Sequence, residues 1–241
     1  GGSIEIIENR IRTEKKIDVK TSNPIVVYRE VITKPSQEAM GKSPNKHNKF
    51  RLIVEPLEQG VYNALVEGKI PEGKPKGKQL WEPLISAGLP REEARKVLNI
   101  RNRCVFIDAT KGVQYMQEIM ELLLKAFEEA VDKGPLAKEK VVGVKVKLTD
   151  ATIHEDPAHR GPAQIIPAMR QAIKLAMLEG GEVIYEPKQV IRIDAPEAYF
   201  GTLTKIISSK RGQRTPIFTP ENRYTSELSQ PNTKQKIYSR I

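Results

Sequence analysis

The chain has three histidines, and all of them lie in polar segments rather than in an apolar stripe. His47 belongs to a lysine-rich stretch, and His154 and His159 lie in one run that also contains Glu155 and Arg160. Histidines in such surroundings are not expected to be core residues. Three kinds of site could use them: a metal centre, a nucleophilic catalyst or a surface that contacts RNA.

A metal site is the sharpest chemical alternative, since imidazole and carboxylate groups are common ligands of zinc. The zinc-protease motif places its two histidines four residues apart on one helix. His154 and His159 are five residues apart with Pro157 between them, and proline disfavours a continuous helix. A metal-dependent hydrolase that uses His154, Glu155 and His159 is therefore kept only as an alternative.

Nucleophilic or nucleotide chemistry has less support. No serine lies in the glycine-flanked turn that exposes a catalytic serine. The single cysteine, Cys104, precedes an apolar run at residues 105–107 and is expected to be a core residue of a strand. The P-loop pattern fails because Ser36 stands where the GKS at residues 41–43 would require a first glycine. The chain itself is therefore predicted not to be an enzyme, and no cofactor is expected in it.

A contact surface for RNA fits the charge of the chain. The formal net charge is +10 and the pI is about 9.5, which favours a polyanionic partner. Basic residues crowd residues 34–51 against one acid, Glu38, and Arg160 precedes an expected helix N-terminus that can hold an anion. Aromatic residues are only 5% of the chain, so backbone contact is expected to dominate over base stacking. A stand-alone RNA-binding factor and a pair of merely solvated basic loops are the alternatives.

Apolar periodicity predicts alternating strands and helices. Strands are predicted at residues 17–21, 25–33, 50–56, 103–108, 142–148 and 190–194. Helices are predicted at residues 4–16, 90–98, 113–131, 164–178 and 196–208, with Pro167 tolerated in a first turn. Loops are expected at 34–49 and 68–78, and the tail 214–241 is expected to be an extended arm or partly disordered. This order predicts an α/β (α+β) fold with a two-layer domain.

Composition also bears on location. No apolar run approaches the roughly 18 residues that a membrane helix needs, so no membrane partner is expected. The start, GGSIEII, has neither the basic nor the apolar part of a signal peptide and is expected to be a truncation point. With one cysteine and thus no internal disulfide, the chain is predicted to be cytoplasmic.

Three ordered motifs point to one family. SPNKHN at residues 43–48, KGPLA at 133–137 and HEDPAHRGPAQ at 154–164 resemble elongation factor 2 of the archaeal and eukaryotic type. PIVVYRE at 24–30 and SKRGQ at 209–213 fit the same family, so the resemblance extends over about residues 4–213. The Pro-Ala pair at 162–163 resembles the archaeal form.

The resemblance implies a domain layout. Residues 1–22 would be the tail of a third domain, and residues 23–187 a fourth domain that enters the decoding centre of the ribosome. Residues 188–241 would be a partial or divergent ferredoxin-like fifth domain. The family's GTPase domain, which binds GTP and magnesium, is not in this chain. The chain would thus be a fragment of a ribosomal translocase.

The resemblance also implies roles for the polar loops. In the family, the second histidine of the H-x-D-x-x-H-R-G loop becomes diphthamide, which by position is His159. The expected partners are the ribosome, transfer RNA, messenger RNA and the diphthamide-synthesis enzymes. The residues expected to contact RNA are Lys42, Asn45, Lys46, His47, Lys49, His154, Asp156, His159 and Arg160.

Overall fold

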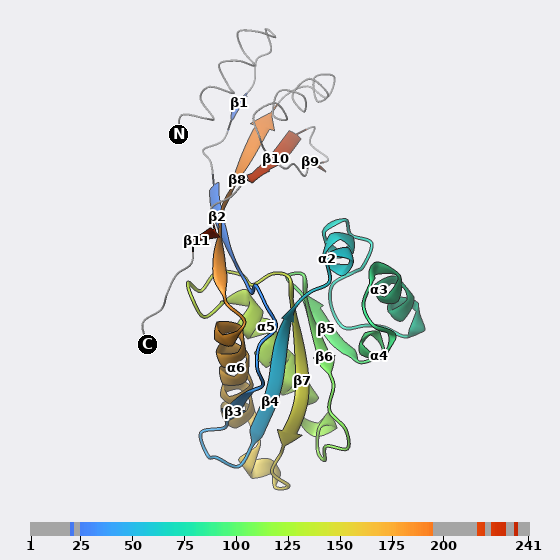
Figure 1. Cartoon of the computed structure of the whole chain (residues 1–241), viewed down its shortest axis with the longest axis vertical. Coiled ribbons are helices and arrows are strands. Elements are labelled where there is room, and N and C mark those ends of the chain that lie inside the picture. The colour runs from blue at the N-terminus through green and yellow to red at the C-terminus, as the bar shows by residue number, and fades with distance from the viewer. Residues whose placement is uncertain (1–19, 22–24, 195–215, 220–222, 230–233, 236–241) are drawn as a thin grey trace. The chain divides into compact units, whose positions relative to one another are not determined.

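A computed structural model describes residues 20–21, 25–194, 216–219, 223–229 and 234–235 of the chain (Figure 1). The chain divides into two compact units, one of which contains Glu30–Ile184. We call this unit the central domain, and every candidate functional residue lies in it. The helices predicted at 4–16 and 196–208 lie outside the described residues.

A mixed sheet of five strands forms the middle of the central domain, in the order β3-β4-β7-β6-β5. Only β6 and β7 run parallel, and the other neighbours are antiparallel. Parallel neighbours need a crossover connection, which here contains helix α5. The strands are β3 (Ala39–Lys42), β4 (Lys49–Pro56), β5 (Val97–Arg101), β6 (Cys104–Asp108) and β7 (Val144–Thr152).

Two long helices, α5 and α6, cover one face of this sheet (Figure 1). Their apolar side chains meet those of the strands in a core that includes the fully buried Phe50, Phe106 and Phe127. Gly41 of β3 lies so close to α6 that a Cβ there would overlap the carbonyl oxygen of Ala168. The helices of the domain are α2 (Gln59–Val66), α3 (Trp81–Ala87), α4 (Arg91–Ala94), α5 (Met120–Asp132) and α6 (Pro162–Glu179), with 3-10 turns at Lys78–Leu80, Gln117–Ile119 and Pro157–His159.

The short helices α2, α3 and α4 form a second core with strands β5 and β6. Side chains alternate along β6, so Cys104 and Phe106 enter the first core, whereas Val105 and Ile107 enter the second. Burial raises the pKa of the Cys104 thiol to about 12. The core role predicted for this cysteine is confirmed.

The other unit is built on a second sheet, of six strands. Its longest strand, β8, pairs antiparallel with β10 and with β1, and β10 pairs with β9. β2 and β11 also pair with β8. These strands are β1 (Lys20–Thr21), β2 (Ile25–Val31), β8 (Val183–Asp194), β9 (Pro216–Thr219), β10 (Arg223–Ser229) and β11 (Lys234–Gln235).

The predicted α/β class is confirmed, and the strands expected at 25–33, 50–56, 103–108 and 142–148 are present with shifted ends. The connection at 34–49 is not entirely a loop, because residues 39–42 pair with β4 as strand β3. Helices α2 and α3 were not predicted, since each is too short to show a sustained apolar period. Within the described residues, every helix is too short or too polar to span a bilayer.

The helix predicted from Val113 begins only at Met120. Gly112 and Tyr115 have φ of 63° and 64°, and such left-handed residues do not fit a right-handed helix. Val113 and Met116 nevertheless pack against the core, so their spacing imitates a helical stripe.

Two other expectations were wrong in detail. The helix predicted at 90–98 covers only Arg91–Ala94, because the residues after it pair with β6 as β5. Pro167 lies inside α6 rather than in its first turn, and both Pro167 and Ala163 are exposed, so the carbonyl group freed by the proline can bind water. The tail, expected to be an extended arm or partly disordered, contains the strands β9 and β10 among its described residues; β10 pairs with β8, and β9 pairs with β10.

Two glutamates, Glu30 and Glu182, are buried in the central domain. Glu30 accepts hydrogen bonds from the backbone N–H groups of Leu136 (2.7 Å) and Glu139 (2.9 Å). Among the described groups, neither carboxyl oxygen of Glu182 has a hydrogen-bond donor. Burial, and secondly the neighbouring Glu30, raise the pKa of Glu182 to about 9. Folded Glu182 therefore carries its proton at neutral pH.

This protonation predicts a pH dependence of stability. Between pH 4.5 and about 9 the unfolded chain has lost the Glu182 proton while the folded chain keeps it, so stability falls as pH rises through this window. The slope for one such group is at most about 1.4 kcal/mol per pH unit. Urea unfolding of Glu182→Gln from pH 5 to 9 should show a flatter profile than the unsubstituted chain. The exposed Glu179→Gln is the matched control, and an equally flat profile for it would contradict the assignment.

Candidate RNA interface at one edge of the sheet

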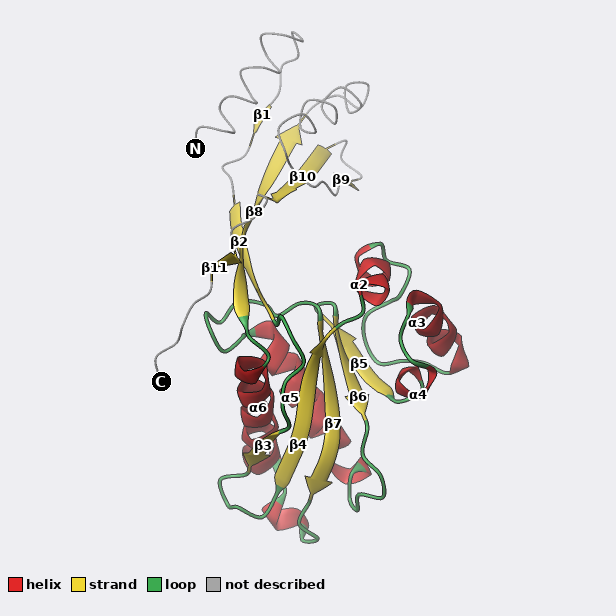
Figure 2. Cartoon of the chain, viewed as in Figure 1, coloured by secondary structure: helices red, strands yellow, loops and turns green. Residues whose placement is uncertain are grey.

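Two polar loops leave the same edge of the five-stranded sheet. β3 ends at Lys42 opposite Lys49, where β4 begins, and Lys49 lies opposite Thr152, where β7 ends. The turn at residues 43–48 and the loop at residues 153–161 therefore lie next to each other (Figure 2). We call them the first turn and the histidine loop.

The first turn is closed by its own hydrogen bonds. The backbone N–H of Ser43 donates to the carbonyl oxygen of Asn48 at 2.9 Å, and that of Lys46 donates to Ser43 at 2.8 Å. Lys46 has φ of 64°, the left-handed conformation that reverses the chain here. The side chain of Asn45 accepts from the N–H of His47 at 3.1 Å. The turn therefore exposes Lys46 and His47 at its tip.

The histidine loop also has a defined local structure. Asp156 caps the 3-10 turn Pro157–His159, because its Oδ1 accepts from the N–H of Ala158 at 2.9 Å. The N–H of Asp156 donates to Nδ1 of His154 at 3.0 Å, which requires the second ring nitrogen to carry the proton in the neutral imidazole. Gly161 is the N-cap of α6.

Asn48 joins the two loops. Its side chain is fully buried, its Nδ2 donates to the carbonyl oxygen of His159 at 2.8 Å, and its Oδ1 accepts from the N–H of His154 at 3.0 Å. Asn45 donates from its side-chain amide to the same His159 carbonyl at 2.8 Å, and its backbone N–H donates to Oε1 of Gln164. Both ends of the histidine loop are therefore held by amides of the first turn.

As a result, the three histidines meet. The ring centroids of His47 and His154 are 4.8 Å apart, those of His47 and His159 4.9 Å, and those of His154 and His159 4.6 Å. The side chain of His159 remains 45% exposed, and its Nε2 lies 4.0 Å from a carboxylate oxygen of Asp156, an ion pair when His159 is protonated. The histidine cluster thus combines residues that are more than 100 positions apart in the chain.

Arg160 makes two contacts within the site. Its Nη1 donates to the carbonyl oxygen of His154 at 3.2 Å, and its guanidinium carbon lies 4.8 Å from the centre of the Tyr115 ring. Such a cation–π contact stabilises the folded loop by about 0.5–1 kcal/mol at exposed sites. Arg160, predicted as an RNA contact, is half-buried and holds the histidine loop to the segment between β6 and α5.

Three lysines lie in the first turn or in the strand residues that flank it. Lys42 and Lys46 are exposed and Lys49 is half-buried. Among the residues that the structure describes, none of the three takes part in an ion pair. Their charge is therefore available to a polyanion.

The metal alternative gains no support from this geometry. Within the described part of the chain, no group of His, Cys, Asp and Glu side chains is arranged to hold a metal ion. One nitrogen of His154 already accepts a backbone hydrogen bond, and Asp156 is used as a cap.

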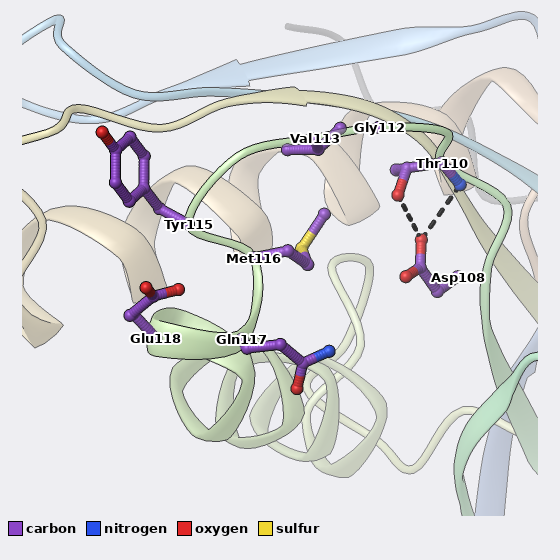
Figure 3. A pocket seen from close by; sticks show the side chains of 8 residues that line it. All are labelled: Asp108, Thr110, Gly112, Val113, Tyr115, Met116, Gln117 and Glu118. Carbon is purple, nitrogen blue, oxygen red and sulfur yellow. Dashed lines mark hydrogen bonds between the residues drawn. The ribbon is translucent and has the colours of Figure 1, made fainter.

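A shallow cavity of about 300 Å³ lies beside the site, in the segment between β6 and α5 (Figure 3). At its rim Asp108 accepts hydrogen bonds from the N–H (2.9 Å) and the hydroxyl group (2.6 Å) of Thr110. The residues that line it are Asp108, Thr110, Gly112, Val113, Tyr115, Met116, Gln117 and Glu118.

The nine residues predicted to contact RNA lie in the two loops or in the strand residues that flank them, but the sequence did not indicate the groups that hold the loops together. Ser43, Asn48, Gln164 and Tyr115 were missed. A buried asparagine between a histidine and a lysine gives no signal in a single sequence. Asn45, predicted to contact RNA, donates its amide to the His159 carbonyl.

Known proteins share much of this sequence. The family model described as "Elongation factor G, domain IV" matches residues 75–181. Proteins named elongation factor 2 from Thermococcus onnurineus and Thermococcus kodakarensis are 50% and 49% identical to the chain over 211 residues. The one from Methanosphaera stadtmanae is 46% identical over 210 residues.

The chain belongs to the elongation factor 2 family. The resemblance drawn from the motifs is confirmed, since each of these alignments covers 87% of the chain. The chain spans only 29% of the length of these elongation factor 2 relatives.

Replacement of Asn48 should uncouple the two loops. In the unsubstituted chain the Asn48 amide donates to the His159 carbonyl oxygen. Asn48→Asp replaces this donor with a carboxylate oxygen, which can only accept, so the carbonyl loses the bond. An unsatisfied buried polar group costs about 1–3 kcal/mol, and we expect a loss of this size in the free energy of unfolding. The C–H proton signals of the three histidine rings should shift as well. Asn63→Asp, at an exposed amide on α2, is the control; ring signals that stay unchanged in Asn48→Asp would contradict the clamp.

Proposed function

We propose that the chain acts in translation as part of a ribosomal translocation factor, and that the first turn and the histidine loop contact RNA at the decoding centre. The membership in the elongation factor 2 family makes the ribosome the expected partner. Transfer RNA, messenger RNA and ribosomal RNA are the proposed contacts within it.

The observation that carries this proposal is the histidine cluster with the exposed lysines around it. Because side-chain amides of the first turn donate to the His159 carbonyl oxygen of the histidine loop, the loops present a rigid edge from which Lys42, Lys46 and His47 project. A preorganised basic edge of low aromatic content suits the phosphates and the shape of folded RNA. Lysines supply compact positive charges there.

His159 is the proposed acceptor of diphthamide, and the diphthamide-synthesis enzymes are its proposed further partners. Its imidazole is 45% exposed while its carbonyl oxygen is held by two amides. A modifying enzyme could therefore reach the ring without unfolding the loop. His154, by contrast, uses one ring nitrogen for the Asp156 N–H.

GTP hydrolysis is proposed only for the whole translocation factor. The sequence has no P-loop motif, and binding of GTP and its magnesium ion is therefore assigned in this proposal to the GTPase domain of that factor. The part that this chain would play is positioning on RNA. Cytoplasmic localisation belongs to the same proposal.

Mass spectrometry tests the modification. The chain, produced in an archaeal host that makes diphthamide, should carry the added mass on the peptide with His159 and on no other histidine. His159→Gln should lack it, and His47→Gln should keep it. An unmodified His159 peptide from that host would count against the assignment.

Salt dependence tests the RNA contact. Each phosphate contact that a lysine makes steepens the fall of log affinity with log salt by about one unit. Lys42→Gln and Lys46→Gln should therefore each lower this slope by about one when the chain binds archaeal ribosomes. Lys174→Gln, an exposed lysine on α6, should leave it unchanged. If all three variants keep the slope of the unsubstituted chain, the proposed contact is wrong.

A further inference from the structure

We propose that residues 109–116 form a third RNA-contacting loop, with Lys111 as its contact to phosphate and Tyr115 as the residue that positions it. We call this segment the third loop. The inference rests on the proposed function, because it adds a loop to the same interface.

The third loop leaves the sheet at the same edge as the histidine loop. β6 runs parallel to β7, and its last residue, Asp108, lies opposite Leu148. The N–H of Ala109 continues the ladder with a hydrogen bond of 2.8 Å to the carbonyl oxygen of Leu148. Parallel strands end at the same edge of a sheet, so the third loop, after β6, lies beside the histidine loop, after β7 (Figure 2).

Arg160 connects the two loops directly. Its guanidinium lies over the ring of Tyr115 in the third loop, at 4.8 Å, and donates to the carbonyl oxygen of His154 in the histidine loop, at 3.2 Å. A movement of Tyr115 would therefore displace the Arg160 guanidinium, which holds the histidine loop through the His154 carbonyl oxygen.

Tyr115 also has a strained backbone. Its φ of 64° is uncommon for a bulky residue, and such a conformation persists where the surroundings over-determine it, often at functional sites. Here the next residue, Met116, is buried in the core, and Tyr115 packs at the margin of the same core. Figure 3 shows the Tyr115 ring and the Met116 side chain on different sides of the backbone. Asp108 fixes the other end of the loop through its two hydrogen bonds with Thr110. The strained residue is thus the point at which the loop turns from the core toward Arg160.

The side chains left outside suit a nucleic acid backbone. Lys111 and Gln114 are exposed, and within the described residues Lys111 is in no ion pair. Asp108 is half-buried and accepts from Thr110, and the exposed acid nearest in sequence to Lys111 is Glu118, beyond the loop. Lysine and glutamine donors are typical contacts to phosphate and sugar.

The first experiment measures the binding of the full chain to archaeal ribosomes at stepped salt concentrations. Lys111→Gln should lower the slope of log affinity against log salt by about one unit, as Lys46→Gln does. Lys125→Gln removes an exposed lysine of α5, the helix after the loop, and should leave the slope unchanged. If Lys111→Gln binds with the same slope as the unsubstituted chain, the third loop is not a contact.

The second experiment separates positioning from contact. Tyr115→Ala should weaken binding and shift the ring signals of the histidine cluster, whereas Tyr115→Phe keeps the ring and should behave as the unsubstituted chain. If Tyr115 positions Lys111, then Lys111→Gln should have little further effect in the Tyr115→Ala background. Fully additive effects in the double variant would overturn the positioning role.

These outcomes distinguish the two proposals. If Lys42→Gln and Lys46→Gln lower the slope and Lys111→Gln does not, only the third loop is wrong. If none of the three lowers it, the interface itself is wrong, and the third loop with it.

Discussion

The site depends on one buried side chain, that of Asn48. Among the described residues, its amide is the only group that bonds both to the His154 N–H and to the His159 carbonyl oxygen. These two groups lie near the beginning and the end of the histidine loop. An amide suits this position because it offers a donor and an acceptor in one plane. Inside the protein such bonds are strong, and an unpaired group would be costly. The geometry of the histidine cluster results from this pairing.

The clamp also explains how charge is distributed over the edge. Loops normally leave many polar groups to water, but here amides and backbone groups of the first turn and the histidine loop satisfy one another. Arg160 is drawn inward by Tyr115 and the His154 carbonyl. The lysines have no such partners in the described part of the chain and are left facing outward. The two hydrogen-bonded loops therefore carry lysines at their surface.

The fold was predictable where side-chain periodicity matches the buried face. The strand at residues 50–56 and most of the helix at 164–178 are of this kind, whereas the strand at 103–108 is predicted from a continuous apolar run. Prediction failed where backbone conformation or pairing decides against periodicity. Tyr115 has a left-handed backbone that delays α5 despite apolar spacing before it. β5, β9 and β10 exist because neighbouring strands pair with them, which single-sequence patterns do not contain.

The sequence by itself determined the α/β class, the family through its three motifs, the net positive charge and the polar loops that carry the histidines. These are local properties, written in residue types and short spacings. Only the tertiary structure decided that His47 meets His154 and His159, that Asn45 and Arg160 hold the site together, and that Tyr115 belongs to it. The reason is strand register: pairing of β4 with both β3 and β7 brings together loops that are over 100 residues apart, and no local pattern encodes that distance.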